Sequence, residues 1–513
     1  MNIIREKRRI RAIWLCTLLL VLGTQADASR IGRKGTAFTL NDGPYNMWGI
    51  EISAAALSDE NTEQAIDALN TYVKYGVSTI ALSFQPAGCG RGVFAADGSI
   101  GDQALFDRIM RLTRAAEERW MISALRVFSP EPSARLEPAA CKRALEDLGH
   151  AFRGRTDVVM NIGFASDVKT LPESVRVLRN GKRGFSGLVG VDLNSISKES
   201  IVSAEARDSA KSLDVVFCDG SPETPIANPG LDKPVVVAAV VEDPQKPGNP
   251  HPKMNEFTQA IAKSNGTFLI ARIPSFCEGS STRFDIGGQY AKSGIGIAWY
   301  LQRVCDVQLS LHGPIEESMG GAPDLHLLDP GEKEEGFVPL FDGRTLQGWT
   351  MLSDSWHSFS VADGVIACDG TSPNAYLRTA RQYSDFVLRL EVKISEGGNS
   401  GVFIRAPLWG RSSRVGFETQ VLGGSEPDPV SNAGAVYGVL APKVDAMKPI
   451  GEWNAFEIAC QGEHVRIKLN GKLIQDFDMG DIPAMKDRLR EGVIGLQDHR
   501  CKVWFRRIRL KEL

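Results

Sequence analysis

The sequence predicts two folded domains of different class, an α/β barrel followed by an all-β sandwich. Long apolar runs alternate with amphipathic segments in the first part of the chain. A stretch rich in glycine, proline and acidic residues follows at 312–335, and beyond it short strands are separated by turn signals. Because the chain has 513 residues, its length also predicts two or more domains.

The composition is that of a folded globular protein. Hydrophobic residues make up 43% of the chain and charged residues 24%, which excludes a disordered or collagen-like protein. The formal net charge of −3 provides no positive excess for binding nucleic acid, so we expect no nucleic-acid partner.

Residues 1–28 are predicted to be a signal peptide that does not belong to the fold. Basic residues from Arg5 to Arg11 precede an apolar run at 12–23 that is too short to cross a bilayer, and Ala26-Asp27-Ala28 is a small-x-small cleavage signal. We expect a secreted or periplasmic protein without stable membrane insertion after cleavage. A short membrane anchor is the alternative. In an oxidising compartment, one or two disulfides are expected among the remaining cysteines.

Eight apolar runs predict the strands of a (β/α)8-like barrel within residues 35–311. These runs are 48–53, 78–84, 121–128, 157–165, 187–193, 214–220, 234–241 and 267–273. Helical patterns fall near 65–73, 102–119, 139–152, 197–211, 254–264 and 288–303. Apolar strands that alternate with helices predict a parallel sheet covered on both faces, and eight such units match a closed barrel. A doubly wound open sheet is the runner-up, although no Gly-x-Gly-x-x-Gly motif follows the first strand.

Polar residues end several of these strands, where barrel enzymes place their active sites. The candidates are Glu51, Gln85, Arg126, Asn161, Asp192, Asn194, Asp219, Glu242 and Arg272. In outline, this half resembles the barrels of glycoside hydrolases. The clan whose acid ends strand 4 has an Asn-Glu pair there, whereas Asn161-Ile162-Gly163 has no carboxylate. Because glycosidic cleavage normally needs two carboxylates, we favour a degenerate or structural barrel and interpret Glu242 as a loop carboxylate.

Residues 336–513 predict an all-β sandwich. Short strands are expected at 386–392, 401–405, 417–422, 455–459, 465–469, 493–496 and 503–510. The pair Asn470-Gly471 lies between two apolar strands and predicts a hairpin with a two-residue turn. The tryptophans of this segment are interpreted as core packing rather than sugar platforms, and they are Trp349, Trp356, Trp453 and Trp504.

A series of motifs in this segment resembles a single family. The motifs are Leu340-Phe341-Asp342-Gly343 with Gly348-Trp349, Asn399-Ser400-Gly401 with Arg405, Phe417-Glu418-Thr419-Gln420, Gly434-Ala435-Val436-Tyr437, Gly451-Glu452-Trp453-Asn454, Leu496-Gln497-Asp498-His499 and Phe505-Arg506. Because these motifs occur in this order, residues 336–513 resemble the DUF1080 family, also called the 3-keto-disaccharide hydrolase domain. Arg507 departs from the family's usual asparagine. The resemblance implies a concanavalin-like jelly roll and activity on 3-keto glycosides.

Strand alternation is expected to bring polar side chains of these motifs to one face. Residues two apart share a face, so Glu418 and Gln420 point together, as do Gln497 and His499. With the resemblance, these positions predict a polar groove suited to a sugar. We expect the catalytic residues to be Glu418, His499 and Arg405. We expect the substrate-binding residues to be Asn399, Gln420, Tyr437 and Gln497.

The chemistry of a 3-keto sugar assigns roles to this set. A carbonyl at C3 acidifies the hydrogen at C2, and the glycosidic oxygen at C1 is β to that carbonyl. Cleavage by proton abstraction, elimination and addition of water needs a base, a stabiliser of the enolate and an acid. Glu418 is expected to be the base, Arg405 or His499 the stabiliser, and His499 alternatively the acid. A divalent metal held by Glu418 and His499 is an alternative electrophile.

The favoured function is that of a secreted hydrolase that cleaves a 3-keto glycoside through its C-terminal domain. The expected partner is therefore a carbohydrate substrate. The main alternative is a non-catalytic carbohydrate-binding sandwich attached to the barrel. A glycosidase that acts through the barrel, with the sandwich holding its substrate, comes third.

Overall fold

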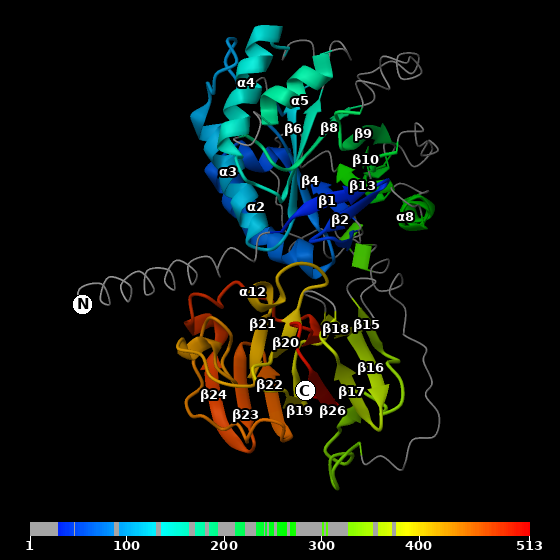
Figure 1. Cartoon of the computed structure of the whole chain (residues 1–513), viewed down its shortest axis with the longest axis vertical. Coiled ribbons are helices and arrows are strands. Elements are labelled where there is room, and N and C mark those ends of the chain that lie inside the picture. The colour runs from blue at the N-terminus through cyan, green and yellow to red at the C-terminus, as the bar shows by residue number, and fades with distance from the viewer. Residues whose placement is uncertain are drawn as a thin grey trace, which may run out of the picture.

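The computed structural model contains the two predicted domains, one above the other in Figure 1. It describes residues 29–45, 47–86, 92–129, 135–163, 170–179, 184–192, 211–220, 232–240, 242–243, 246–250, 254–263, 267–272, 300–301, 304–305, 327–351, 358–371 and 376–513. The predicted signal peptide, most of the predicted helices at 197–211 and 288–303, Asn194 and Trp356 lie outside the described residues.

Eight parallel strands close into a barrel, as the sequence predicted. In chain order they are β4 (Trp48–Glu51), β5 (Thr79–Ser83), β6 (Ile122–Phe128), β7 (Val158–Gly163), β8 (Leu188–Asp192), β9 (Val215–Gly220), β10 (Val235–Val240) and β13 (Thr267–Arg272). Each strand pairs with the next along this series, and β13 also pairs with β4. The ring is therefore complete, and the alternative of an open sheet is wrong.

Helices cover the outside of the barrel. Those described are α2 (Asp59–Lys74), α3 (Gln103–Glu117), α4 (Pro138–Ala151), α5 (Leu171–Arg179) and α8 (Met254–Lys263), with the 3-10 turn η1 (Ser53–Ala56) before α2. Ser58 starts α2 and Asp102 starts α3, because each side chain accepts a hydrogen bond from a backbone N–H of the first turn. Helix α5 was not predicted, because its nine residues are too few for a helical period to be distinguished.

Two small antiparallel sheets accompany the barrel and were not predicted. One consists of β1 (Ile31–Lys34), β2 (Ala37–Leu40) and β3 (Gly43–Tyr45), and the other of β11 (Glu242–Asp243) and β12 (Lys246–Pro250). Phe38 of β2 lies 4.6 Å from Phe268 of β13 between ring centroids, and Ile31 is buried in the same core. The barrel domain therefore includes residues before the expected boundary at 35.

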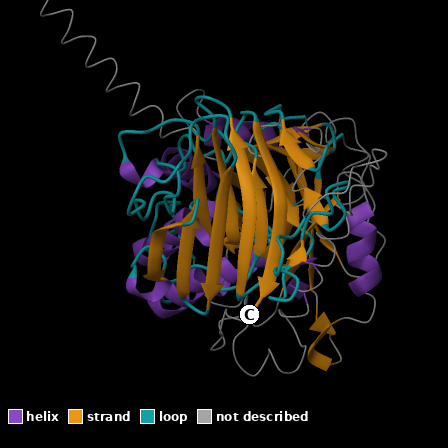
Figure 2. Cartoon of the chain, turned by 90° about the horizontal axis from the view of Figure 1, so that it is seen from below, coloured by secondary structure: helices purple, strands orange, loops and turns teal. Residues whose placement is uncertain are grey.

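The C-terminal domain consists of two antiparallel sheets. The larger has the order β16 (Phe359–Ala362), β17 (Val365–Cys368), β26 (Val503–Glu512), β19 (Phe386–Ile394), β22 (Asn454–Gln461), β23 (His464–Leu469) and β24 (Lys472–Asp478), with β14 (Val338–Pro339) beside β26. The smaller has the order β15 (Trp349–Met351), β18 (Tyr376–Thr379), β25 (Val493–Gln497), β20 (Asn399–Ala406) and β21 (Phe417–Leu422). Short helices lie between strands at α12 (Ser412–Val415), η7 (Pro429–Ser431) and η8 (Met479–Asp481). Figure 2 looks onto the long strands of the domain, which lie side by side.

One hydrophobic core joins the two sheets. It contains Leu388 and Leu390 of the larger sheet together with Val402 and Leu496 of the smaller. All seven predicted strands are present, whereas β14 to β18 have only two to four residues each and were not predicted. The hairpin at Asn470-Gly471 is also present, with both residues at positive φ (51° and 79°), as a type I′ turn requires.

The end of the predicted linker is folded against the sandwich. The buried Glu332 carboxylate pairs with Arg509 at 2.7 Å and with Arg389 at 2.9 Å. Arg507 pairs with Asp329 and lies 3.0 Å from Glu391. The domain therefore begins before the expected boundary at 336, and these ion pairs give Arg507, which differs from the family pattern, a structural role.

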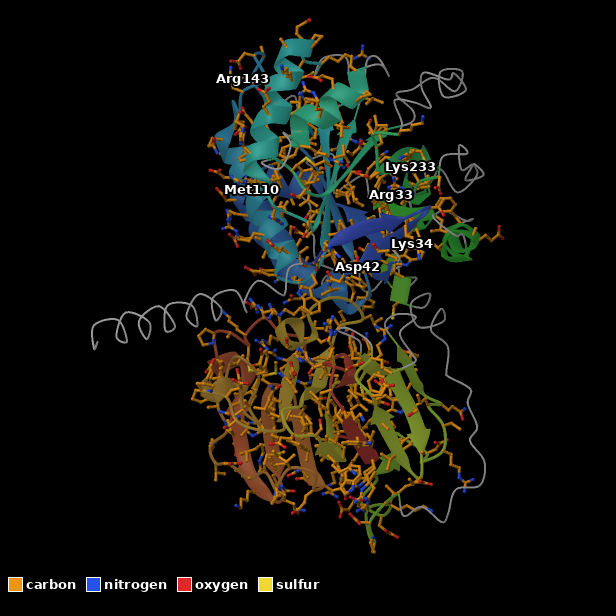
Figure 3. The ribbon with its side chains drawn as sticks, viewed as in Figure 1. Arg33, Lys34, Asp42, Met110, Arg143 and Lys233 are labelled. Atoms are coloured by element: carbon orange, nitrogen blue, oxygen red, sulfur yellow. The ribbon has the colours of Figure 1, made fainter. Side chains whose placement is uncertain are left out.

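The sandwich contacts the end of the barrel at which the strands begin. The backbone N–H of Trp409 donates to the carbonyl of Val73 at 3.0 Å, and that of Leu408 donates to Lys74 at 3.2 Å. These carbonyls end α2, just before β5, and need partners from outside the helix. Figure 3 shows Asp42 at the end of the barrel that faces the sandwich and Arg143 at the far end. Barrel enzymes use the opposite end of the strands for catalysis.

Two further expectations concern cysteines and membranes. Among the described residues, Cys141, Cys368, Cys460 and Cys501 are free thiols, so the expected disulfides do not form between these four. No helix within the described ranges is long and apolar enough to span a bilayer.

Candidate active site

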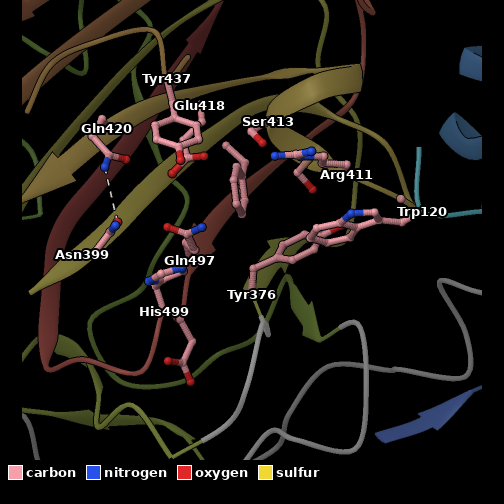
Figure 4. Close-up of a pocket in the computed structure, with 14 residues that line it drawn as sticks. Trp120, Tyr376, Asn399, Arg411, Ser413, Glu418, Gln420, Tyr437, Gln497 and His499 are labelled. Carbon is pink, nitrogen blue, oxygen red and sulfur yellow. Dashed lines mark hydrogen bonds between the residues drawn. The ribbon is translucent and has the colours of Figure 1, made fainter. Parts of the chain in front are cut away.

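A pocket opens on the smaller sheet of the sandwich, on the face turned toward the barrel. Figure 4 shows its polar residues converging from neighbouring strands. The space within it, including the open mouth, is about 710 Å³. The lining residues are Trp120, Tyr376, Asn399, Phe403, Gly410, Arg411, Ser412, Ser413, Glu418, Gln420, Tyr437, Gln497, Asp498 and His499.

Glu418 is the buried acid of this pocket. The residue is 3% exposed, and its carboxylate has no hydrogen bond or ion pair with any described residue. Burial raises the pKa of Glu418 to about 8, and the positive charge of nearby Arg411 opposes that rise only in part. A buried carboxylate without a partner costs folding free energy, and such groups concentrate at functional sites.

Gly401 makes room for this carboxylate. It lies on β20 opposite Gln420 of β21, two pairs along from the pair of Phe403 and Glu418. A Cβ atom at position 401 would stand 2.1 Å from Oε1 of Glu418 and 2.7 Å from Cδ. The glycine of the Asn399-Ser400-Gly401 motif is therefore needed so that the Glu418 side chain can lie across the neighbouring strand.

Amide side chains surround the acid. Gln420 Nε2 donates to Asn399 Oδ1 at 3.4 Å, and the backbone N–H of Tyr437 donates to the carbonyl of Glu418 at 3.0 Å. The Oε1 atoms of Gln420 and Gln497 are buried without a hydrogen-bond partner among the described residues. These oxygens are ready acceptors for the hydroxyl groups of a ligand. All four predicted substrate-binding residues thus line one pocket.

His499 also lines the pocket, but strand alternation does not place it there. β25 ends at Gln497, and the exposed His499 follows in an irregular segment. Across the described ranges, no three His, Cys, Asp or Glu side chains gather in a way that would hold a metal ion. Among the described residues, Glu418 and His499 are thus two ligand-type side chains without a third.

Arg405 was expected in the groove, and this placement is wrong. The pairing of β20 with β25 shifts between Phe403 and Ala406, and Arg405 has a positive φ of 50°. This bulge turns the side chain away from the pocket face. The guanidinium is fully buried and donates to the carbonyls of Ser384 and Gly462 at 2.8 Å each, and to Asp385 at 3.1 Å. Arg405 therefore ties loops together.

Arg411 is the cation that does lie in the pocket, and sequence reasoning missed it. Its side chain points into the space between Glu418 and Trp120 (Figure 4). It lies in the loop after β20, where no strand period indicates a direction. Tyr376, Phe403 and Ser413 were missed for related reasons. The sequence could have indicated only Phe403 among these residues. The alternation of β20 places it on the same face as Asn399 and Gly401.

Four of the predicted polar residues at the barrel mouth form ion pairs with one another, whereas the side chains of Asp219 and Glu242 lie outside the described part of the chain. Glu51 lies 2.9 Å from Arg272, and Asp192 lies 3.3 Å from Arg126 and accepts a hydrogen bond from Asn161 at 3.1 Å. These carboxylates are neutralised by arginines. Gln85 instead accepts a hydrogen bond from the backbone of Ser129 at 2.8 Å.

The prediction of core packing is confirmed for Trp349 and wrong for Trp453 and Trp504, which are partly exposed. Trp349 is fully buried and donates to the carbonyl of Leu340 at 2.7 Å. Trp453 and Trp504 both lie near Lys393, at 5.1 Å and 4.7 Å between the ammonium and the ring centroid. The tryptophan of the pocket is Trp120, which belongs to the barrel.

Comparison with known proteins agrees with the resemblance seen in the sequence. Residues 336–511 match the family model described as a 3-keto-alpha-glucoside-1,2-lyase-like domain. A 3-keto-disaccharide hydrolase of Bacteroides thetaiotaomicron is 28% identical over 231 residues, which cover 35% of this chain and 79% of that protein. The C-terminal domain is therefore similar to this family, as predicted.

Solved structures that are similar to part of this chain include two from carbohydrate-active proteins. A candidate glycosyl hydrolase of Parabacteroides distasonis is 25% identical, with a TM-score of 0.33, and the match covers 36% of this chain and 98% of that one. The catalytic domain of alkaline cellulase K is 12% identical, with a TM-score of 0.38, and the match covers 55% of this chain and 96% of that one.

Proposed function

We propose that this protein cleaves the glycosidic bond of a 3-keto sugar in the pocket of its C-terminal domain, which we interpret as a concanavalin-like jelly roll. The observation that carries the proposal is the buried, unpartnered carboxylate of Glu418. A general base works best when its pKa lies near the working pH, and a pKa of about 8 meets this condition. The family matched by residues 336–511 supports the same substrate class.

The proposed reaction begins with removal of the C2 proton. Glu418 takes this proton, and the electron pair moves to the C3 carbonyl oxygen to give an enolate. The enolate re-forms the carbonyl and expels the glycosidic oxygen from C1, which leaves a double bond between C1 and C2. Water then adds, with its hydroxyl at C1 and a proton returned to C2. The sum is hydrolysis, with no change in oxidation state.

Arg411 takes the role that the sequence assigned to Arg405. Its guanidinium is the cation that acts on Glu418, so it also lies close to a sugar whose C2 faces that carboxylate. A fixed positive charge next to the developing enolate lowers the barrier. We assign His499, which lines the pocket, as the acid that protonates the departing oxygen. Gln420 and Gln497 hold the sugar hydroxyls through their free oxygens.

The test is turnover by the full chain on a 3-keto disaccharide and on its unoxidised parent. We expect monosaccharide release from the keto sugar alone, because only that sugar has an acidic C2 hydrogen. Glu418→Gln should lower kcat by about 10²–10⁴, while Glu452→Gln, at an exposed glutamate of the same domain, should not change it. Release from both sugars, or full activity of Glu418→Gln, would contradict the proposal.

The same assay decides two alternatives. Turnover is also measured with a chelator and with an added divalent metal. These two measurements test the alternative proposal that a divalent cation held by Glu418 and His499 supplies the electrophile. Binding without turnover would assign the pocket to a carbohydrate-binding module. The buried acid counts against that second function, because a binding site gains nothing from an uncompensated carboxylate.

Export is a separate proposal that rests on the sequence of residues 1–28. A carbohydrate-active role outside the cytoplasm accords with it. Expression of the full chain in a bacterial host, followed by N-terminal sequencing of the mature protein, should give Ser29 as the first residue. Retention of Met1 in the cytoplasmic fraction would contradict export.

A further inference from the structure

The pocket is shared between the two domains. Of the described residues that line it, Trp120 alone comes from the barrel, where it lies in the turn between α3 and β6. In Figure 4, Trp120 and Tyr376 lie at one end of the pocket and Glu418, Gln420 and Tyr437 at the other, with Arg411 between them. The pocket therefore has an aromatic end and a polar end that contains the acid.

The interface fixes the position of the Trp120 ring relative to the sandwich. The Trp120 carbonyl accepts a hydrogen bond from the indole of Trp409 at 3.1 Å, and the Arg119 carbonyl accepts one from the backbone N–H of Arg411 at 3.3 Å. Gly410 permits this approach, because a Cβ there would stand 2.4 Å from the Arg119 carbonyl oxygen. The barrel turn and the pocket loop thus contact each other through their backbones.

Trp120 occupies a position that favours glycine. Its φ is +60°, and the N–H groups of Trp120 and Met121 close the end of α3 by bonding to the carbonyls of Glu117 and Ala116. Helices commonly end with glycine in this left-handed conformation, because a side chain strains it. Trp120 is partly exposed, so it is not a fully buried core residue. Strained residues of this kind cluster at ligand sites.

We infer that Trp120 forms the subsite for the second sugar of the substrate, the one that leaves when the glycosidic bond breaks. This inference rests on the proposed function. The keto ring must lie at the polar end, because Glu418 removes its C2 proton there. The second sugar then extends past Arg411 toward Trp120, whose ring offers a flat apolar surface for the C–H face of a pyranose.

The neighbouring residues support a stacking subsite at this end. The Tyr376 hydroxyl is bonded to the Pro407 carbonyl at 3.2 Å, and the Tyr376 ring packs edge-on against Phe403 at 5.3 Å between centroids. The Arg411 guanidinium lies 6.0 Å from the centre of the Trp120 ring. This end therefore presents ring surfaces next to Arg411, whereas the side-chain amides of Gln420, Asn399 and Gln497 lie toward the other end. The barrel contributes specificity for the leaving sugar and no reacting group.

The experiment measures binding by the full chain that carries Glu418→Gln, which slows turnover. Two ligands share the keto ring: a 3-keto disaccharide and a 3-keto methyl glycoside, which lacks the second sugar. We expect Trp120→Gly to weaken binding of the disaccharide about tenfold and to leave binding of the methyl glycoside unchanged. Trp120→Phe, which keeps a ring, should stay within about threefold of the parent for both ligands.

Thermal unfolding separates a binding role from a structural one. Because glycine suits the left-handed turn, Trp120→Gly should keep or raise the Tm. A lower Tm with equal weakening of both ligands would make Trp120 a packing residue and overturn the inference. Unchanged disaccharide binding would overturn it as well.

The same measurements distinguish failure of the proposed reaction from failure of the Trp120 subsite. If the unsubstituted chain turns over neither ligand but Trp120→Gly still weakens disaccharide binding selectively, the subsite stands and the proposed reaction does not. If the unsubstituted chain turns over the keto disaccharide with a KM that Trp120→Gly does not change, the reaction stands and the subsite does not. If the chain binds neither sugar, both are overturned.

Discussion

A Cβ atom on Gly401 would stand 2.1 Å from Oε1 of Glu418. This relationship between two neighbouring strands couples a glycine of one motif to the acid of another. It explains in physical terms why both positions are needed for one site. The carboxylate occupies the space that any side chain at 401 would fill.

Gly401→Ala is therefore expected to displace the acid while leaving the fold intact. The obstructing atoms are the end of a flexible side chain, so Glu418 can move, but it then loses its position in the pocket. We expect kcat to fall by about 10²–10⁴, as for loss of a general base. Gly424→Ala, whose Cβ would meet nothing within 4 Å, is the matched control. Full activity of Gly401→Ala would contradict the assigned position of the base.

The pH dependence should follow the raised pKa of Glu418. The base must be ionised, so kcat/KM is expected to rise with pH until about 8 and then level off. Folding should show the opposite trend. The folded-state pKa is raised, so the native state favours the protonated acid and stability falls as the pH rises toward 8. Glu418→Gln should flatten that decline in Tm, and a decline of equal slope in this variant would exclude Glu418 as its cause.

Arg405 should matter for stability rather than turnover. Replacing it with lysine leaves buried carbonyls without donors, and we expect a loss of about 1–3 kcal/mol in the free energy of unfolding. The kcat/KM of the folded fraction should not change. Denaturant unfolding and steady-state kinetics on the same preparation separate the two effects. A large fall in kcat at unchanged stability would restore a catalytic role to Arg405.

Arg411 should matter for turnover. Arg411→Met keeps the backbone contact with Arg119 but removes the cation next to the enolate, and we expect kcat to fall by about 10²–10³. Arg411→Lys should recover part of this loss. The control is Arg381→Met, because Arg381 pairs with Glu512 on the exposed surface of the same domain. Equal effects of the two methionine variants would argue against a role for Arg411 in the reaction.

Gly410 should hold the two domains together. Gly410→Ala places a Cβ 2.4 Å from the backbone of Arg119, and its φ of +95° disfavours any side chain. We expect the domains to unfold in separate calorimetric transitions in this variant. Gly438→Ala has a comparable positive φ of +67° but meets nothing within 4 Å, so it should leave the transition unchanged. Identical calorimetry for the two variants would mean that the contact at Gly410 does not couple the domains.

The sequence determined the elements and their order. Eight apolar runs predicted the eight barrel strands, because strands buried on both faces have a continuous apolar pattern. Alternation along 417–422 placed Glu418 and Gln420 on one face, because side chains in a strand alternate with a period of two. The Asn470-Gly471 turn was predicted because few other pairs adopt two successive left-handed residues.

The tertiary structure decided which side chains meet. A bulge at Arg405 turns its side chain to the opposite face from the one that alternation predicts, and the sequence of β20 contains no pattern that indicates this bulge. Arg411 lies in a loop, and Trp120 lies more than 250 positions before every other described pocket residue, in a different domain. Periodicity is a local property of the chain, whereas a pocket at a domain interface depends on how two separately folded surfaces pack. The acid at Glu418 was therefore predictable from the sequence, and the aromatic wall that faces it was not.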